Sequence, residues 1–183
     1  DYEHPDSQKL VAEVQAEYVE MYGSGDEAPL SAEDFLAGKG EFFVGYIDDH
    51  PIAMGGWRKF DDSAAEIKRM YVIADYRRMG FATQMLRHVE EAIKAAGFQR
   101  AILGTGAVQI AAIEMYLRNG YERTAPFGYY QDPEDSRHFG KSFLQLGVSM
   151  ARVMGCEIEY GIIVAGLPNA NPMVASSDVV NSY

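Results

Sequence analysis

The chain has a single cysteine, Cys156, among its 183 residues. One cysteine excludes an internal disulfide and any metal cage built from several thiolates. The four histidines, at positions 4, 50, 88 and 138, show no spacing typical of metal ligands. We therefore expect no structural or catalytic metal.

Long apolar runs are also lacking. No stretch approaches the ~18 consecutive apolar residues that a membrane-spanning helix needs. No secretory signal pattern precedes the first predicted helix. We expect a cytoplasmic protein that has no membrane partner.

A basic surface is the third feature that the sequence lacks. The formal net charge is −11, and residues 1–65 carry 15 acidic but only four basic side chains. Without a basic stripe, nucleic-acid binding is disfavoured. Residues 66–144 carry nearly equal numbers of acidic and basic side chains. An anionic cofactor bound to residues 66–144 and a cationic acceptor beside residues 1–65 would suit this charge asymmetry. The alternative is ordinary solvated surface charge.

The elements that are present alternate between the helical and the strand period. At 183 residues the chain is long enough for one domain with a real core. Apolar residues at helical spacing predict helices that begin at Asp6 or Ser7, at Ser31, near Gly80 and at Gln109. Strands are predicted at 41–47, 52–60, 64–72, 100–103, 121–130 and 137–144. This order predicts one α+β domain with helices around a mixed sheet.

The central feature is the segment that joins a strand ending at Val72 to a helix beginning near Gly80. The first N–H groups of a helix lack intrahelical partners and carry partial positive charge, which favours anions. Arg77 and Arg78 add two cations at this end. The segment therefore predicts a diphosphate site, and the alternative is an ordinary strand–loop–helix connection.

A second, matching segment indicates a family. Arg77-x-x-Gly80-x-Ala82 and Ala112-x-x-x-Tyr116-x-x-x-Gly120-Tyr121 together resemble the pyrophosphate loop and the second acetyl-CoA motif of the Gcn5-related N-acetyltransferase (GNAT) superfamily. The resemblance covers about residues 7–144. Leu103 to Gly106, Gln109 and Phe127 to Tyr130 are similar to one large bacterial branch, which usually has Glu where this chain has Gly104.

This resemblance implies the GNAT acyl-CoA N-acyltransferase fold, an α+β, three-layer arrangement with a mixed, mostly antiparallel central sheet flanked by helices. In this fold the fourth and fifth strands splay apart, and the pantetheine of the co-substrate acetyl-CoA inserts between them. The implied cofactor contacts are the backbone of Met70, Tyr71 and Val72, the loop residues Arg77, Arg78, Met79, Gly80, Phe81, Ala82 and Thr83, and Gln109, Ala112 and Tyr116.

The resemblance also implies two catalytic residues. Tyr116 is expected to protonate the departing thiolate as a general acid, because a phenol with a pKa of ~10 can donate to the sulfur. Its alternative is a core tyrosine at helical spacing. Glu66 is expected to remove the amine proton, through water. Its alternative is a solvated carboxylate at the start of a strand.

The expected reaction is transfer of acetyl from acetyl-CoA to a primary amine by direct attack in a ternary complex. Aromatic residues and the acidic first segment suggest a small cationic or aromatic amine as acceptor, and a protein amino group fits as well. These aromatic residues are Tyr22, Trp57, Phe60, Tyr129 and Tyr130. The alternative function is a non-catalytic acyl-CoA sensor or scaffold, and a homodimer is compatible with either.

The last residues follow a different pattern. Residues 150–183 resemble the amino terminus of the bacterial depupylase/Pup-deamidase family, in which Glu-x-Glu-Tyr-Gly supplies metal and nucleotide ligands. Those positions would be Glu157 and Glu159, but the ATP-binding domain that they need is absent. We predict a GNAT domain over residues 1–144 and a C-terminal extension over 145–183. Two interpretations of the extension are open: that it arose by fusion or read-through between neighbouring genes, and that 157–164 is simply an extra strand, which is the structural role we favour.

Overall fold

The computed structural model describes residues 1–132 and 134–143. The helices are α1 (Pro5–Tyr22), α2 (Phe81–Ala95) and α3 (Ile110–Arg118), with short 3-10 helices η1 (Ala32–Phe35) and η2 (Ala74–Tyr76). The strands are β1 (Gly40–Ile47), β2 (His50–Lys59), β3 (Ala64–Val72), β4 (Arg100–Gly106), β5 (Glu122–Arg123) and β6 (Ser136–Ser142). The predicted strand at 157–164 lies outside the described residues.

One six-stranded sheet organises this part of the chain, in the order β1-β2-β3-β4-β6-β5. Only the β3–β4 pair within it is parallel; the other strand pairs are antiparallel. The helix that connects the parallel strands, α2, makes the crossover such a pair requires. The predicted mixed, mostly antiparallel sheet flanked by helices is confirmed.

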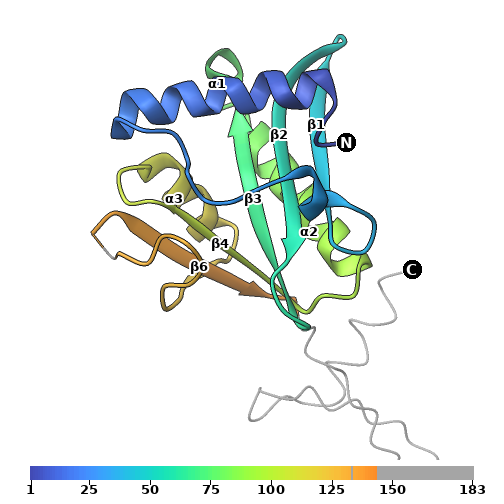
Figure 1. The fold of residues 1–183 in the computed structure, drawn as a ribbon, viewed down its shortest axis with the longest axis vertical. Helices are drawn as coiled ribbons and strands as arrows, with labels where there is room; N and C mark the ends of the chain where they lie inside the picture. The colour runs from blue at the N-terminus through green and yellow to red at the C-terminus, as the bar shows by residue number, and fades with distance from the viewer. Residues whose placement is uncertain (133, 144–183) are drawn as a thin grey trace, which may run out of the picture. The chain divides into compact units, whose positions relative to one another are not determined.

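The two faces of the sheet are covered by different helices. In Figure 1, α1 crosses in front of β1, β2 and β3, whereas α2 lies behind them. Under α1, the apolar side chains Leu10, Val14, Phe42, Met54 and Tyr71 form one core cluster. We call the side of the sheet that carries α1 the front face.

The larger core lies on the other side of the sheet. Helix α2 contributes Met85, Leu86, Val89 and Ile93, which recur at helical spacing and lie against inward-facing strand residues. Helix α3 adds Ile113 and Tyr116 to the same cluster. This core fixes the start of α2 against the end of β3, which positions the predicted cofactor loop.

Strands β3 and β4 pair over only part of their length. Their register begins at Ala64↔Arg100 and ends at Glu66↔Ile102, although β3 continues to Val72 and β4 to Gly106. Figure 1 shows the two strands diverging beyond the end that they share. One backbone edge of β3 beyond Glu66 is therefore left without β4 as a partner, and β2 pairs with the opposite edge.

A β-bulge lies in β3 just beyond this divergence. Met54 pairs with Tyr71 and Gly56 with Lys68, so Gly55 faces two residues, Arg69 and Met70. Arg69 has φ +59°, a value that residues other than glycine seldom adopt. Because of the extra residue, the side chains of Lys68 and Arg69 both lie on the front face, whereas Met70 packs behind the sheet.

The predicted strand at 121–130 is wrong in extent. Only Glu122 and Arg123 pair with β6, followed by one further ladder bond from Thr124 N–H to the His138 carbonyl. Pro126 lacks the N–H that a ladder needs, and Gly128 has φ +73°. The segment therefore leaves the sheet, and its aromatic residues turn toward the front face.

Within residues 1–132 and 134–143, no helix is long and apolar enough to cross a membrane. Nor does this part of the chain group three or more His, Cys, Asp or Glu side chains in a way that could hold a metal ion.

Candidate active site

The amino terminus of α2 is open toward solvent. Gly80 is the N-cap, with φ +91°, and no side chain caps the helix there. The N–H groups of Phe81, Ala82 and Thr83 have no acceptor inside the helix, because they belong to its first turn. Arg78 also has a left-handed φ of +63°. Left-handed residues next to a bare helix terminus form a concave array of N–H groups suited to an anion.

The two predicted phosphate-binding arginines differ. The Arg77 Nη2 donates to Glu17 Oε2 on α1 at 2.7 Å, and its Nε donates to the Val72 carbonyl at 2.8 Å. Its backbone N–H bonds to the Ala74 carbonyl. Both arginines are exposed, so they differ in these contacts and not in burial. The structure thus directs Arg77 toward α1 and leaves Arg78 at the helix terminus.

The predicted pantetheine edge, Met70 to Val72, lies where β3 has lost β4. The Val72 carbonyl already accepts the hydrogen bond from Arg77. The Tyr71 hydroxyl donates to Glu17 Oε1 at 2.8 Å, and burial together with that carboxylate raises the pKa of Tyr71. This segment is therefore clamped to α1 through side chains, while one backbone edge faces away from β2.

Tyr116 is buried, with 5% of its surface exposed. Its ring packs edge-on against Tyr121 at 5.7 Å between ring centroids and near Phe139 at 6.3 Å. Burial raises the pKa of Tyr116 above its usual value of about 10, and the neighbouring Tyr18 acts in the same direction; the hydroxyl is protonated at neutral pH with or without this shift. The ring contacts fit a core tyrosine, and a protonated hydroxyl is compatible with a general acid, so both interpretations of Tyr116 stand.

Gln109 and Ala112 lie on α3 across the divergence from β3. The Thr105 hydroxyl of β4 donates to Gln109 Oε1 at 2.7 Å. Gln109 also hydrogen-bonds Tyr18 and Tyr22, both near the end of α1. Ala112 is half-buried against the core. These contacts join α1, β4 and α3 at the mouth of the divergence, and the role predicted for Gln109 in bonding backbone or cofactor stays a prediction.

Glu66 is buried, with 6% exposure, so its interpretation as a solvated carboxylate is wrong. Its Oε2 accepts from Arg58 Nε at 2.9 Å, and its Oε1 lies 3.4 Å from Lys68 Nζ. Arg58 in turn reaches the Pro29 carbonyl and Asp34 Oδ1. The cause of the burial is tertiary: β2 supplies Arg58, and the loop before η1 covers it.

His138, which the sequence did not single out, lies on β6 opposite Gly104. Ser136 Oγ donates to the Asp132 carbonyl at 2.8 Å, so it accepts from His138 Nε2 at 3.0 Å. The other ring nitrogen, Nδ1, is buried without a hydrogen-bond partner. Burial lowers the pKa of His138, so the ring is neutral with an unshared lone pair on Nδ1. A Cβ at position 104 would lie 3.4 Å from the His138 Cε1, which is an ordinary van der Waals contact.

Arg69 and Asp26 form a second group that sequence reasoning missed. Arg69 Nη1 lies 3.0 Å from Asp26 Oδ2, with 5% and 18% of the two side chains exposed. Asp26 Oδ1 accepts a hydrogen bond from the Tyr130 hydroxyl at 3.0 Å. The bulge and the loop after α1 bring these residues together, and neither feature has a sequence signal at Arg69.

Four of the five predicted acceptor-side aromatics are substantially exposed: Tyr22, Phe60, Tyr129 and Tyr130. Trp57 is a correction. It is 2% exposed and packs edge-on against Phe98 behind the sheet, because its position on β2 faces α2.

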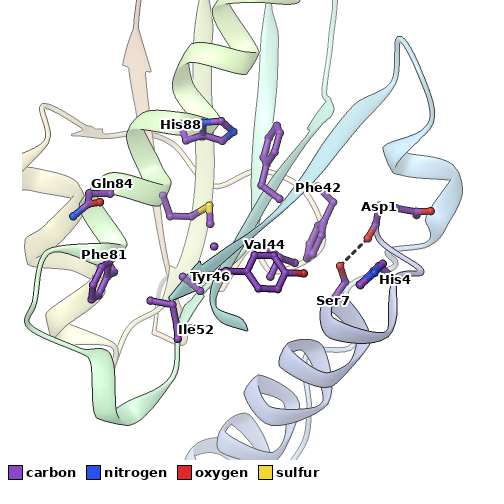
Figure 2. A pocket seen from close by; sticks show the side chains of 14 residues that line it. Asp1, His4, Ser7, Phe42, Val44, Tyr46, Ile52, Phe81, Gln84 and His88 are labelled. Atoms are coloured by element: carbon purple, nitrogen blue, oxygen red, sulfur yellow. Dashed lines mark hydrogen bonds between the residues drawn. The ribbon is translucent and has the colours of Figure 1, made fainter. Parts of the chain in front are cut away.

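The cavity in Figure 2 lies away from these residues, beside the edge strand β1. It has a volume of about 630 Å³ and is lined by the start of α1, by β1 and β2, and by the first turns of α2. Phe81 and Gln84 lie at one side of it and His4 and Ser7 at the other. Of the predicted site residues, only Phe81 is among those that line it.

Comparisons with known proteins agree with this geometry. Residues 8–121 match the Acetyltransferase (GNAT) family. N-acetyltransferase 8 from Homo sapiens is 28% identical over 114 residues, which are 59% of this chain and 50% of that protein. The chain thus spans about half the length of this relative. A depupylase from Acidothermus cellulolyticus is 68% identical over 34 residues, 19% of this chain and 7% of that protein.

Solved structures show the same fold. A protein from Klebsiella pneumoniae described as an acyl-CoA N-acyltransferase has a TM-score of 0.66 at 22% identity, covering 78% of this chain and 93% of its own. A GNAT family acetyltransferase from Elizabethkingia anophelis, solved with acetyl-CoA bound, has a TM-score of 0.50 at 19% identity, covering 63% and 85%. The partial β3–β4 pairing, the open start of α2 and the family match lead to one conclusion: the chain belongs to the GNAT acetyltransferase family.

Proposed function

We propose that the protein is an N-acetyltransferase that moves an acetyl group from acetyl-CoA to a primary amine by direct attack in a ternary complex. One observation carries the proposal. Strand β3 loses β4 as its partner after Glu66, directly before the uncapped amino terminus of α2. An extended amide chain can add to such a strand edge, and a diphosphate can bind at such a helix terminus. Acetyl-CoA contains both parts in that order.

Bound acetyl-CoA would supply the acetyl thioester, and the residues around it would align, polarise and move protons. The Met70–Val72 edge and residues 77–83 would hold the co-substrate. Tyr116, a phenol that is protonated at neutral pH, would donate to the departing thiolate. Glu66 would receive the amine proton through water, although both of its carboxylate oxygens face cations in this structure.

The second candidate function is an acyl-CoA sensor that does not turn over. The observation that favours it is the clamp over the site, in which Arg77 and Tyr71 are both held by Glu17. A clamp of this kind suits retention of a ligand as well as catalysis. Thiol release from acetyl-CoA in the presence of an amine panel separates the two functions.

The test begins with cofactor binding. CoA at a hundredfold excess over its dissociation constant should stabilise the fold by roughly 2.7 kcal/mol, seen as a rise in melting temperature. Gly80→Asp should abolish that rise, because it places a carboxylate at the phosphate site and a side chain at φ +91°. Gly23→Asp, at a left-handed helix end with φ +82° outside the predicted site, is the matched control for backbone strain. A full CoA-induced shift in the Gly80 variant would contradict the assignment.

A further inference from the structure

Arg69 has more hydrogen-bonding capacity than its surroundings use. Its side chain is 5% exposed, yet both Nε and Nη1 are buried without a hydrogen-bond partner. The 3.0 Å approach of Nη1 to Asp26 is an ion pair whose angle does not make a hydrogen bond. Unused donors on a buried guanidinium are costly, so they indicate a group that binds there.

Three carboxylates on the front face, those of Asp26, Asp34 and Glu66, have no matching spare capacity. Asp26 Oδ1 accepts from Ala28 N and Tyr130 Oη, and its Oδ2 faces Arg69. Asp34 accepts from the Ser31 N–H and from Arg58. Glu66 has a cation at each oxygen, Arg58 and Lys68. These acidic groups are neutralised in place, so they do not form an anionic bowl for a cationic amine.

The neighbouring arginine of the front face is a useful contrast. Arg58 donates from Nε to Glu66 and from Nη1 to Pro29 and Asp34. Arg58 therefore uses these donors in hydrogen bonds within the protein. Among the described residues of the front face, Arg69 is the buried cation whose Nε and Nη1 donate no hydrogen bond, and a bound oxygen anion would supply acceptors.

Arg69 also lies next to Met70–Val72, the strand edge proposed to bind acetyl-CoA. It occupies the bulge of β3, three residues beyond the last pairing with β4 at Glu66. Arg69 and Asp26 both lie close enough to Tyr18 to affect its pKa, and Tyr18 in turn affects the pKa of Tyr116. Arg69 and the predicted general acid thus share Tyr18 as a neighbour.

We infer that the acceptor amine also bears a carboxylate, as an α-amino acid does, and that the Arg69 guanidinium binds this carboxylate. The inference rests on the proposed acetyl transfer and names its substrate class. Arginine suits the role because its planar donors match a carboxylate, and a charge-assisted hydrogen bond in a buried site is stronger than a neutral one. The inference departs from the cationic or aromatic amine that the sequence suggested.

The test compares acceptors that differ only in the carboxylate. The full chain is assayed for thiol release from acetyl-CoA with each proteinogenic amino acid, and with the matched pairs tyrosine and tyramine, tryptophan and tryptamine, and histidine and histamine. We expect kcat/KM for the preferred amino acid to exceed that of its decarboxylated amine by about tenfold to a hundredfold. Equal or greater activity on the decarboxylated partners would overturn the inference.

Variants then assign the effect to Arg69. Arg69→Gln should raise KM for the amino acid toward the value of its decarboxylated partner and leave the decarboxylated partner little changed; Arg69→Lys should retain part of the preference. Arg58→Gln is the matched control, because it removes a partnered guanidinium and should leave the preference intact. A uniform fall in kcat for both members of a pair would show that Arg69 acts on the reaction itself, which contradicts carboxylate recognition.

Two measurements keep the outcome decisive. Since Arg69→Gln leaves Asp26 without its cation, the double variant Arg69→Gln/Asp26→Asn tests the preference in a fold without that lone charge. Amino acids are also titrated into the wild-type protein with CoA present, with melting temperature as the readout. Loss of CoA binding or of all thiol release defeats the proposed function. If CoA binds but no amino acid raises the melting temperature above its decarboxylated partner, only the carboxylate inference fails.

Discussion

Tyr116 combines two properties that a single side chain can hold at once. Its ring is part of the core with Tyr121 and Phe139, and its hydroxyl, protonated at neutral pH, is close enough to Tyr18 for that residue to affect its pKa. The two roles can be tested separately, because the ring packs in the core and the hydroxyl is the predicted general acid.

Tyr116→Phe should lower kcat by about 10²–10⁴-fold, the range that general acid catalysis spans, with little change in the CoA-induced rise in melting temperature. The ring stays in place, so stability should change by about 1 kcal/mol or less. Tyr121→Phe, which removes a neighbouring core hydroxyl, is the matched control. Turnover in Tyr116→Phe within about threefold of wild type on a verified acceptor would leave only the packing role.

His138 makes stability depend on pH in a direction that its burial sets. Because burial lowers its pKa, the folded protein keeps the ring neutral at pH values where the unfolded chain, with a histidine pKa of about 6.5, already binds a proton. The unfolded state then binds more protons, so this residue's contribution to stability is present above pH 6.5 and is lost as the pH falls through the lower, folded pKa.

His138→Gln should therefore lose less stability than wild type between about pH 7 and pH 5. The slope of the unfolding free energy against pH should differ between the two proteins by at most the amount that one bound proton contributes. Denaturant unfolding at a series of pH values measures this difference. His88→Gln, at an exposed histidine on α2, should keep the wild-type slope. A slope in His138→Gln equal to that of wild type would mean that His138 is not held neutral.

At the scale of elements, the loop between β3 and α2 divides its two arginines between different tasks. Glu17 on α1 holds Arg77 and Tyr71, which ties the front helix to the end of β3. Arg78 remains at the open helix terminus, where the orphan N–H groups of α2 lie. We therefore expect the proposed anion site to consist mainly of backbone N–H groups and Arg78, with Arg77 holding the loop against α1.

Arg78→Gln should weaken CoA binding more than Arg77→Gln does, by about a few-fold, and should reduce the salt dependence of binding. Arg77→Gln should instead cost about 1 kcal/mol of stability or less, as a partly exposed ion pair does. Calorimetric titration with CoA at two salt concentrations, together with melting curves, compares the two variants. The reverse ranking would show that Arg77 leaves Glu17 to bind phosphate.

At the scale of the whole molecule, residues 1–143 already contain what the proposed function uses. The strands of the described sheet end at Ser142, and both core clusters lie before that point. We propose that residues 1–144 are the acetyltransferase domain and that 145–183 are an extension outside it. The 34-residue similarity to a depupylase covers too little of that protein to bring its activity here.

A chain that ends at Leu144 should therefore fold and keep the CoA-induced rise in melting temperature within error of the full chain. Melting curves of both proteins with and without CoA make the comparison. An insoluble truncated chain, or one that no longer binds CoA, would show that the later residues complete the domain.

The sequence by itself determined the features that depend on neighbouring residues. The Ser31–Asp34 capping box, the left-handed end of α1 at Gly23 and the glycine that opens α2 follow from local backbone chemistry, and the structure has all of them. The order of helices and strands follows from periodicity in the same way, except at 121–130. There Pro126 and Gly128 overrode a strand-like composition.

Only the tertiary structure decided which charges and polar atoms are paired. Glu17 meets Arg77 across 60 residues of chain, Arg69 meets Asp26 through a bulge, and the His138 ring fills the space above Gly104. The burial of Glu66 likewise depends on Arg58 from the adjacent strand. Such pairings arise from sheet register and from helices that cross the sheet, and residue types at local spacing do not encode them. The local pattern therefore predicted the cofactor loop, and only the fold revealed the buried guanidinium of Arg69 with unused hydrogen-bond donors.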